Sequence, residues 1–148
     1  MIPFSKSVRI TLLITKGLIL VIALLALGIF PLIEWSSSIH PLSCEKKLAI
    51  GIGYLCSVPW MIYGLCQLLS LLSNILKAEV FTCGNVTKIR RIRNCCIGTA
   101  LVSVTACLFF LPLIIPAAIM GFLSFVVHAA GQVMYQAVAI REENDLTV

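Results

Sequence analysis

The sequence has little charge for its length. Charged residues make up 11% of its 148 residues and hydrophobic residues 60%, whereas charged residues account for about a quarter of an ordinary soluble domain. The mean hydropathy is +1.08. These values exclude a soluble globular protein and predict a single membrane domain over residues 1–148.

The sequence also lacks the patterns that carry catalysis or hold a cofactor. It contains no phosphate-binding glycine loop and no Ser-His-Asp set. The two histidines, His40 and His128, stand apart from acidic residues, which disfavours a metal site. The seven cysteines include no Cys-x-x-Cys pair, which a thiol oxidoreductase of the membrane needs. We therefore predict a protein that is not an enzyme and that uses no cofactor or metal.

Long apolar runs are the main feature of the chain. A hydrocarbon core of about 30 Å requires roughly 20 apolar residues in a helix. The last run, 95–140, is too long for one crossing, so we expect it to turn back at Pro112 and Pro116. The predicted fold is all-α, an integral membrane bundle of four transmembrane helices in two hairpins, with spans at about 10–33, 48–74, 95–113 and 116–139.

The positions of Lys and Arg predict the orientation. Lys46 and Lys47 flank the spans on one side, and eight Lys and Arg residues flank them on the other. Loops rich in these residues remain in the cytoplasm. We therefore expect both termini, the basic segment 77–94 and the tail 141–148 in the cytoplasm. This asymmetry also explains the net charge of +5, so no direct nucleic-acid binding is expected.

The segment 77–94 is the one long hydrophilic stretch inside the chain. Thr82 or Asn85 can cap a helix there, because each side-chain oxygen can accept a hydrogen bond from a free backbone N–H. Its apolar residues then recur at every third position: Val86, Ile89 and Ile92. This pattern predicts a basic amphipathic turn that lies at the inner membrane surface and runs into the third span. Anchoring on anionic lipid is its simplest role; a dock for a cytosolic protein or for the acidic tail is the alternative.

Polar side chains inside the spans form two stripes. Ser124, His128, Gln132 and Gln136 follow each other at a spacing of four, and the second span carries Tyr63, Gln67, Ser70 and Asn74. Since such residues share a helix face, we expect both stripes to point into the bundle and to form hydrogen bonds between helices. Lys16 either extends to the membrane surface or reaches Gln67 or Gln136. The spans contain no acidic residue, which favours packing over an ion path.

The basic segment and the tail carry a family resemblance. The matching residues are Phe81-Thr82, Asn85-Val86, Ile89-Arg90-x-Ile92 and the terminal run from Glu143 to Val148. With these residues the chain resembles a family of small bacterial four-helix membrane proteins, domain of unknown function 2975. It departs from the family at Arg93, where a glycine often stands, and in its very short turn between the third and fourth spans.

The resemblance implies a multi-pass protein of the bacterial cell membrane with no established activity. It also implies a cytosolic partner, a small DNA-binding regulator of the helix-turn-helix type, in addition to the lipid bilayer. We therefore expect a non-enzymatic interaction or regulatory protein; the alternative is a small transporter or bacteriocin-immunity protein that uses the stripe of the fourth span. The candidate interaction residues are Phe81, Thr82, Asn85, Lys88, Arg90, Arg91, Arg93, Glu142, Glu143, Asn144, Asp145 and Leu146.

Overall fold

Four long helices make up almost all of the structure. The computed structural model describes residues 4–39, 41–77 and 82–146, and within these ranges it contains no strand. The helices are α1 (Phe4–Ile39), α2 (Cys44–Leu76), α3 (Cys83–Cys107) and α4 (Ile114–Leu146), with a short 3-10 helix, η1 (Leu111–Leu113), before α4. The all-α prediction is confirmed.

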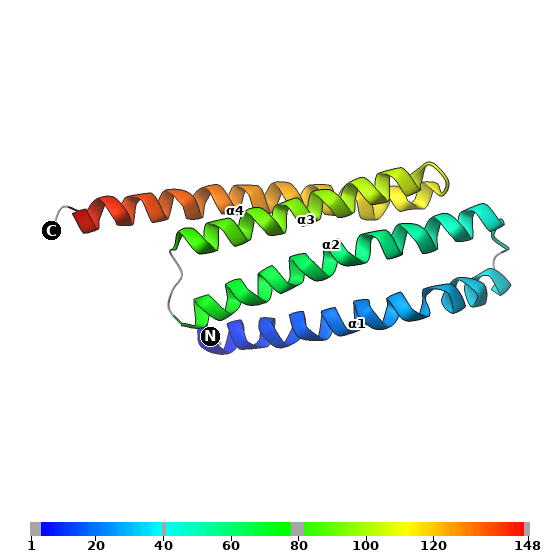
Figure 1. Ribbon diagram of the computed structural model, residues 1–148, viewed down its shortest axis with the longest axis horizontal. Helices are drawn as coiled ribbons and strands as arrows, with labels where there is room; N and C mark the ends of the chain where they lie inside the picture. Colours follow the sequence, from blue (N-terminus) through cyan, green and yellow to red (C-terminus); the bar gives the residue numbers. More distant parts are fainter. Residues whose placement is uncertain (1–3, 40, 78–81, 147–148) are drawn as a thin grey trace.

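The helices pack in chain order and form an open bundle. Successive helices run antiparallel (Figure 1), and α1 packs on α2, α2 on α3, and α3 on α4. Among the described residues α1 packs on neither α3 nor α4. An opening of about 330 Å³ separates them, with Ile29 of α1 on one side and Met120 of α4 on the other. Because α3 is covered by two neighbours, it is the most enclosed helix together with α2.

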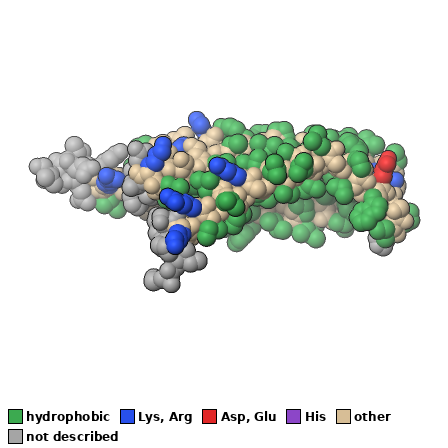
Figure 2. Space-filling model, turned by 90° about the horizontal axis from the view of Figure 1, so that it is seen from below, with side chains coloured by type: hydrophobic (Ala, Val, Ile, Leu, Met, Phe, Trp, Pro, Cys, Tyr) green, Lys and Arg blue, Asp and Glu red, His purple; other side chains and the backbone are tan. Residues whose placement is uncertain are grey.

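In the described part of the chain, three helices are long and apolar enough to cross a membrane. They provide the segments Lys6–Ile39, Cys44–Leu76 and Leu111–Arg141, and hydrophobic side chains cover most of the length of the molecule (Figure 2). Helix α3 is different because its first half carries four basic residues. Its apolar part, 95–107, is about 20 Å long at 1.5 Å per residue, shorter than a hydrocarbon core of about 30 Å.

Helix boundaries correct one prediction in this part of the chain and agree with another. Helix α3 ends at Cys107, so the predicted third span of 95–113 is wrong at its end. The sequence remains apolar through the turn that follows Cys107, so hydropathy does not show where the helix ends. The helix does not continue because Phe110 has an extended backbone (φ −142°, ψ 97°) and Pro112 has no N–H to donate. The residues from Cys83 to Asn94 are the first half of α3 itself and pack on α2 and α4. They continue without a break into the apolar part of α3, which agrees with the prediction of a basic turn that runs into the third span.

Small residues bring α2 and α3 together. Ser57 and Gly64 of α2 and Thr99 and Ala106 of α3 are buried, as expected where membrane helices approach closely. The buried hydroxyl groups donate to their own helices: Ser57 Oγ lies 2.7 Å from the carbonyl of Tyr54. These local bonds satisfy the polar groups without a partner on the next helix.

Gly98 provides a test of this packing. A Cβ added there would lie 2.7 Å from Cδ2 of Trp60, so the indole of α2 would have to move. We expect Gly98→Ala to lower the free energy of unfolding by about 1–3 kcal/mol through overpacking, measured as thermal unfolding of the detergent-solubilised protein. Gly17→Ala is the control, because a Cβ there meets nothing within 4 Å and alanine favours the helix. Equal unfolding temperatures for the two variants would contradict this close contact.

Candidate interaction site at the cationic end

Most basic side chains gather at one end of the molecule (Figure 2). This cationic end is where α1 and α3 begin and α2 and α4 end. Lys46 and Lys47 lie at the opposite end, in the first turn of α2. The residues of the cationic end are Lys6, Arg9, Lys77, Lys88, Arg90, Arg91, Arg93 and Arg141.

A buried amide pair joins α2 to α3 at this end. Asn74 Nδ2 donates to Asn85 Oδ1 at 2.8 Å, and Asn85 is 0% exposed. This bond connects the last turns of α2 to the first turn of α3. Asn85 was predicted as a surface contact and a possible cap, but it lies inside the protein. Thr82 takes the N-cap position with an extended backbone (φ −131°, ψ 145°), although its side chain makes no capping hydrogen bond.

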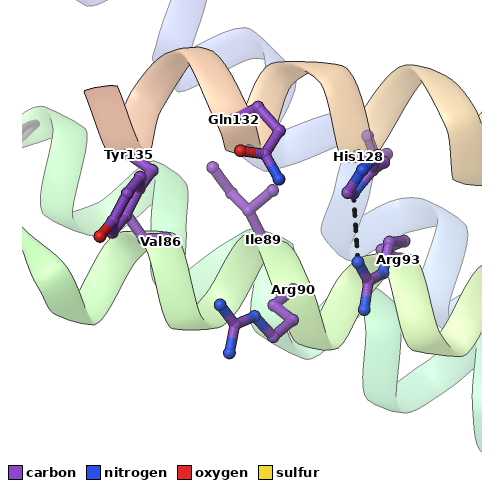
Figure 3. A pocket seen from close by; sticks show the side chains of 9 residues that line it. Val86, Ile89, Arg90, Arg93, His128, Gln132 and Tyr135 are labelled. Atoms are coloured by element: carbon purple, nitrogen blue, oxygen red, sulfur yellow. Dashed lines mark hydrogen bonds between the residues drawn. The ribbon is translucent and has the colours of Figure 1, made fainter. Parts of the chain in front are cut away.

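A pocket of about 170 Å³ lies between α3 and α4 at the cationic end (Figure 3). The helices approach closely here, because a Cβ added to Gly131 of α4 would lie 3.1 Å from Cγ2 of Ile89. The lining residues that Figure 3 labels come from facing sides of the two helices. They are Val86, Ile89, Arg90 and Arg93 of α3, and His128, Gln132 and Tyr135 of α4.

Arg93 is held in this pocket by neutral acceptors. Its Nη1 lies 3.1 Å from Nδ1 of His128, and its Nε and Nη2 lie 3.3 and 3.0 Å from Oδ1 of Asn94. A guanidinium can only donate, so Nδ1 of His128 accepts and the ring hydrogen is on Nε2. These bonds orient the guanidinium but do not neutralise its charge. Arg90 is exposed, and no residue lining the pocket is acidic.

The two polar stripes do not both point into the bundle. In the fourth span Ser124 is buried, whereas His128, Gln132 and Gln136 are exposed. The reason is geometric: a spacing of four advances by about 40° more than a full turn at 3.6 residues per turn, so the stripe rotates out of the core. Each stripe still provides one bond between helices, that of His128 with Arg93 and that of Asn74 with Asn85. The prediction of two inward stripes is therefore wrong for most of their members, although the predicted bonds between helices occur at these two, and the exposure of the stripes does not favour the transporter alternative.

The remaining intramembrane candidates are Lys16 and Gln67, on the neighbouring helices α1 and α2. Lys16 is exposed on α1 and Gln67 is half-buried on α2. Because α1 does not pack on α4 in the described part of the chain, Lys16 does not reach Gln136. The exposure of Lys16 agrees with the other expectation, that its side chain extends towards the membrane surface.

Tyr135 is a pocket residue that the sequence reasoning missed. It follows His128 and Gln132 at spacings of four and three, which keep residues on one side of a helix better than repeated fours. A search for alternating spacings would have grouped these three residues and left Gln136 out. Gly131 was missed as well, because close approach of helices leaves no periodic pattern.

The end of α4 extends beyond the other helices (Figure 1). Gly131 lies against Ile89; α3 begins six residues before Ile89, and α4 continues fifteen residues beyond Gly131. The difference corresponds to an overhang of about 14 Å. By the same register Glu143 lies about 20 Å along the axis from Arg90. The register therefore places Glu143 away from the arginines of α3.

The other predicted interaction residues are distributed around this end. Arg90 and Arg91 are exposed and Lys88 is half-buried on α3, and Glu143 is exposed on α4. Phe81 and the side chains of Glu142, Asn144, Asp145 and Leu146 lie outside the described residues.

Comparison with known proteins identifies one family. The family model described as "Protein of unknown function (DUF2975)" matches residues 31–148, which include the end of α1 and all of α2, α3 and α4. No curated protein and no solved structure matches the chain. The α3–α4 pocket and the overhang of α4 both lie within the matched residues.

Proposed function

The chain belongs to the DUF2975 family of proteins of unknown function, and we propose that it is a non-enzymatic membrane protein that binds a cytosolic regulator. The overhang of α4 carries this proposal. A helix that leaves the membrane and continues beyond the start of α3 offers a partner exposed side chains. Arg141 and Glu143 are exposed there, and the register places them beyond the start of α3.

The proposed orientation places the cationic end in the cytoplasm of a bacterial cell. The cationic end carries more Lys and Arg residues than the opposite end, and such an excess is typical of cytoplasmic loops. All four helices then cross the membrane. Helix α3 is included because α2 and α4 cover it on two sides, while long side chains such as those of Arg90 and Arg91 extend to the inner surface.

The proposed partner is a small DNA-binding protein of the helix-turn-helix type. Such proteins carry a basic surface that contacts phosphate, and the end of α4 contains Glu142, Glu143 and Asp145. Acidic side chains on a helix that reaches into the cytoplasm are complementary to that surface. Binding there would hold the regulator at the membrane and compete with its DNA.

We expect deletion of 142–148 to abolish co-purification of a helix-turn-helix regulator encoded by a neighbouring gene. Membrane insertion should persist, because the deleted residues follow the apolar segment that ends at Arg141. A second variant keeps the length and removes the charge: Glu142→Gln, Glu143→Gln and Asp145→Asn together. The control is Lys46→Gln with Lys47→Gln at the opposite end. Undiminished recovery of the regulator with the deletion variant would contradict the proposal.

A further inference from the structure

The α3–α4 pocket continues into an apolar groove. The groove has a volume of about 390 Å³ and shares Arg93 and His128 with the pocket. From this pair it runs away from the cationic end, along Ile97, Leu101 and Val104 of α3. Spacings of three and four keep these side chains on the face that carries Arg90 and Arg93. Pocket and groove therefore form one continuous depression with a polar end and an apolar end.

The facing side of α4 completes the depression. Gly121 and Phe125 line the apolar groove, and Gln132 and Tyr135 line the polar pocket. Gly121 leaves space there, because a Cβ added to it would meet nothing within 4 Å. The depression is thus open along its apolar part, where a chain-like ligand can lie between the helices.

The polar end has the chemistry of a phosphate site. Two guanidinium groups, of Arg90 and Arg93, belong to its lining, and planar guanidinium groups are well suited to pair with phosphate oxygens. The amide of Gln132 and the hydroxyl of Tyr135 add donors. Neither the pocket nor the groove is lined by an acidic residue, so the site carries an uncompensated positive charge.

The apolar groove is about as long as the hydrocarbon layer of one membrane leaflet. From Arg93 to Val104 the groove follows α3 for eleven residues, about 16 Å at 1.5 Å per residue. One leaflet contributes about 15 Å, half of a hydrocarbon core of about 30 Å. A free anion from water would use only the polar pocket. The order of charge, polar groups and apolar wall matches a lipid that is anchored by its headgroup.

We propose that this depression binds one anionic phospholipid, with its phosphate at Arg90 and Arg93 and an acyl chain along Ile97, Leu101 and Val104. Helix α3 then completes its crossing with the help of this lipid, whose phosphate is paired with the arginines beside its short apolar part. The inference goes beyond the binding of a cytosolic regulator and does not depend on it, because the overhang of α4 takes no part in the site.

Native mass spectrometry of the delipidated full-length protein tests this proposal. Phosphatidylglycerol is titrated against phosphatidylcholine with the same acyl chains, and inorganic phosphate is added as a competitor. We expect phosphatidylglycerol to bind in preference to phosphatidylcholine, and phosphate to displace it only weakly. Equal binding of the two lipids would overturn the choice of an anionic ligand. Full displacement by equimolar phosphate would show a site for the free anion instead.

Two kinds of variant test the two ends separately. Arg90→Gln with Arg93→Gln should weaken phosphatidylglycerol binding about thirtyfold, since each basic residue near a membrane surface contributes roughly fivefold in affinity. Gly121→Leu should weaken it by filling the groove, and Arg90→Gln alone, at an exposed position, keeps the test valid if the double variant fails to fold. Lys46→Gln with Lys47→Gln and Gly17→Leu are the matched controls. Equal losses in the variants and their controls would overturn the proposed site.

Discussion

Replacement of Asn85 by alanine lowers the free energy of unfolding by about 1–3 kcal/mol, because it removes a buried hydrogen bond and leaves an amide without its acceptor. Asn85 is 0% exposed and accepts from Asn74 at 2.8 Å. The bond lies where α2 ends and α3 begins, so its loss should also loosen the first turn of α3. Chemical unfolding of the purified protein, followed by helical circular dichroism, measures the effect.

A double-mutant cycle separates this bond from a general loss of packing. Asn74→Ala alone should also destabilise, and the two changes together should cost less than the sum of the single costs, because either one breaks the same bond. Gln136→Ala is the control, since Gln136 is an exposed amide on α4 and its removal should change stability by less than about 0.5 kcal/mol. Additive costs at Asn74 and Asn85 would show that the two amides act independently.

Cys44 should react with a membrane-impermeant thiol reagent in intact cells, whereas Cys83 should not. The two residues begin α2 and α3 at opposite ends of the bundle, and both are exposed. Different labelling therefore reports the side of the membrane and not burial. The expected direction follows from the excess of Lys and Arg at the end that contains Cys83.

Single-cysteine variants make the labelling experiment specific. In each of the two variants the other six of the seven cysteines are replaced by serine. The one that remains, Cys44 or Cys83, should react in either variant once the membrane is permeabilised. Labelling of Cys83 alone in intact cells would place the cationic end outside and contradict the proposed orientation. Labelling of both before permeabilisation would contradict a membrane crossing by α2, the helix that separates Cys44 from Cys83.

The site shows where one-dimensional patterns stop being informative. Arg90 and Arg93 were grouped from the sequence as part of one basic segment, and His128 and Gln132 as part of a stripe in another helix. Their meeting in one pocket depends on the register of α3 against α4, which the contact of Gly131 with Ile89 reflects. Hydropathy cannot show such a register, because it adds the transfer free energies of single side chains and contains no term for contacts between helices.

Sequence alone establishes the class of this protein, an all-α chain whose long apolar helices have their basic residues mostly at one end. Length, hydropathy and charge decide these features, since each follows from the cost of transferring groups from water into lipid. The burial of Asn85 and the opening between α1 and α4 follow from the tertiary packing alone. These features depend on which small side chains let two helices approach closely, and such contacts join residues that are far apart in the chain.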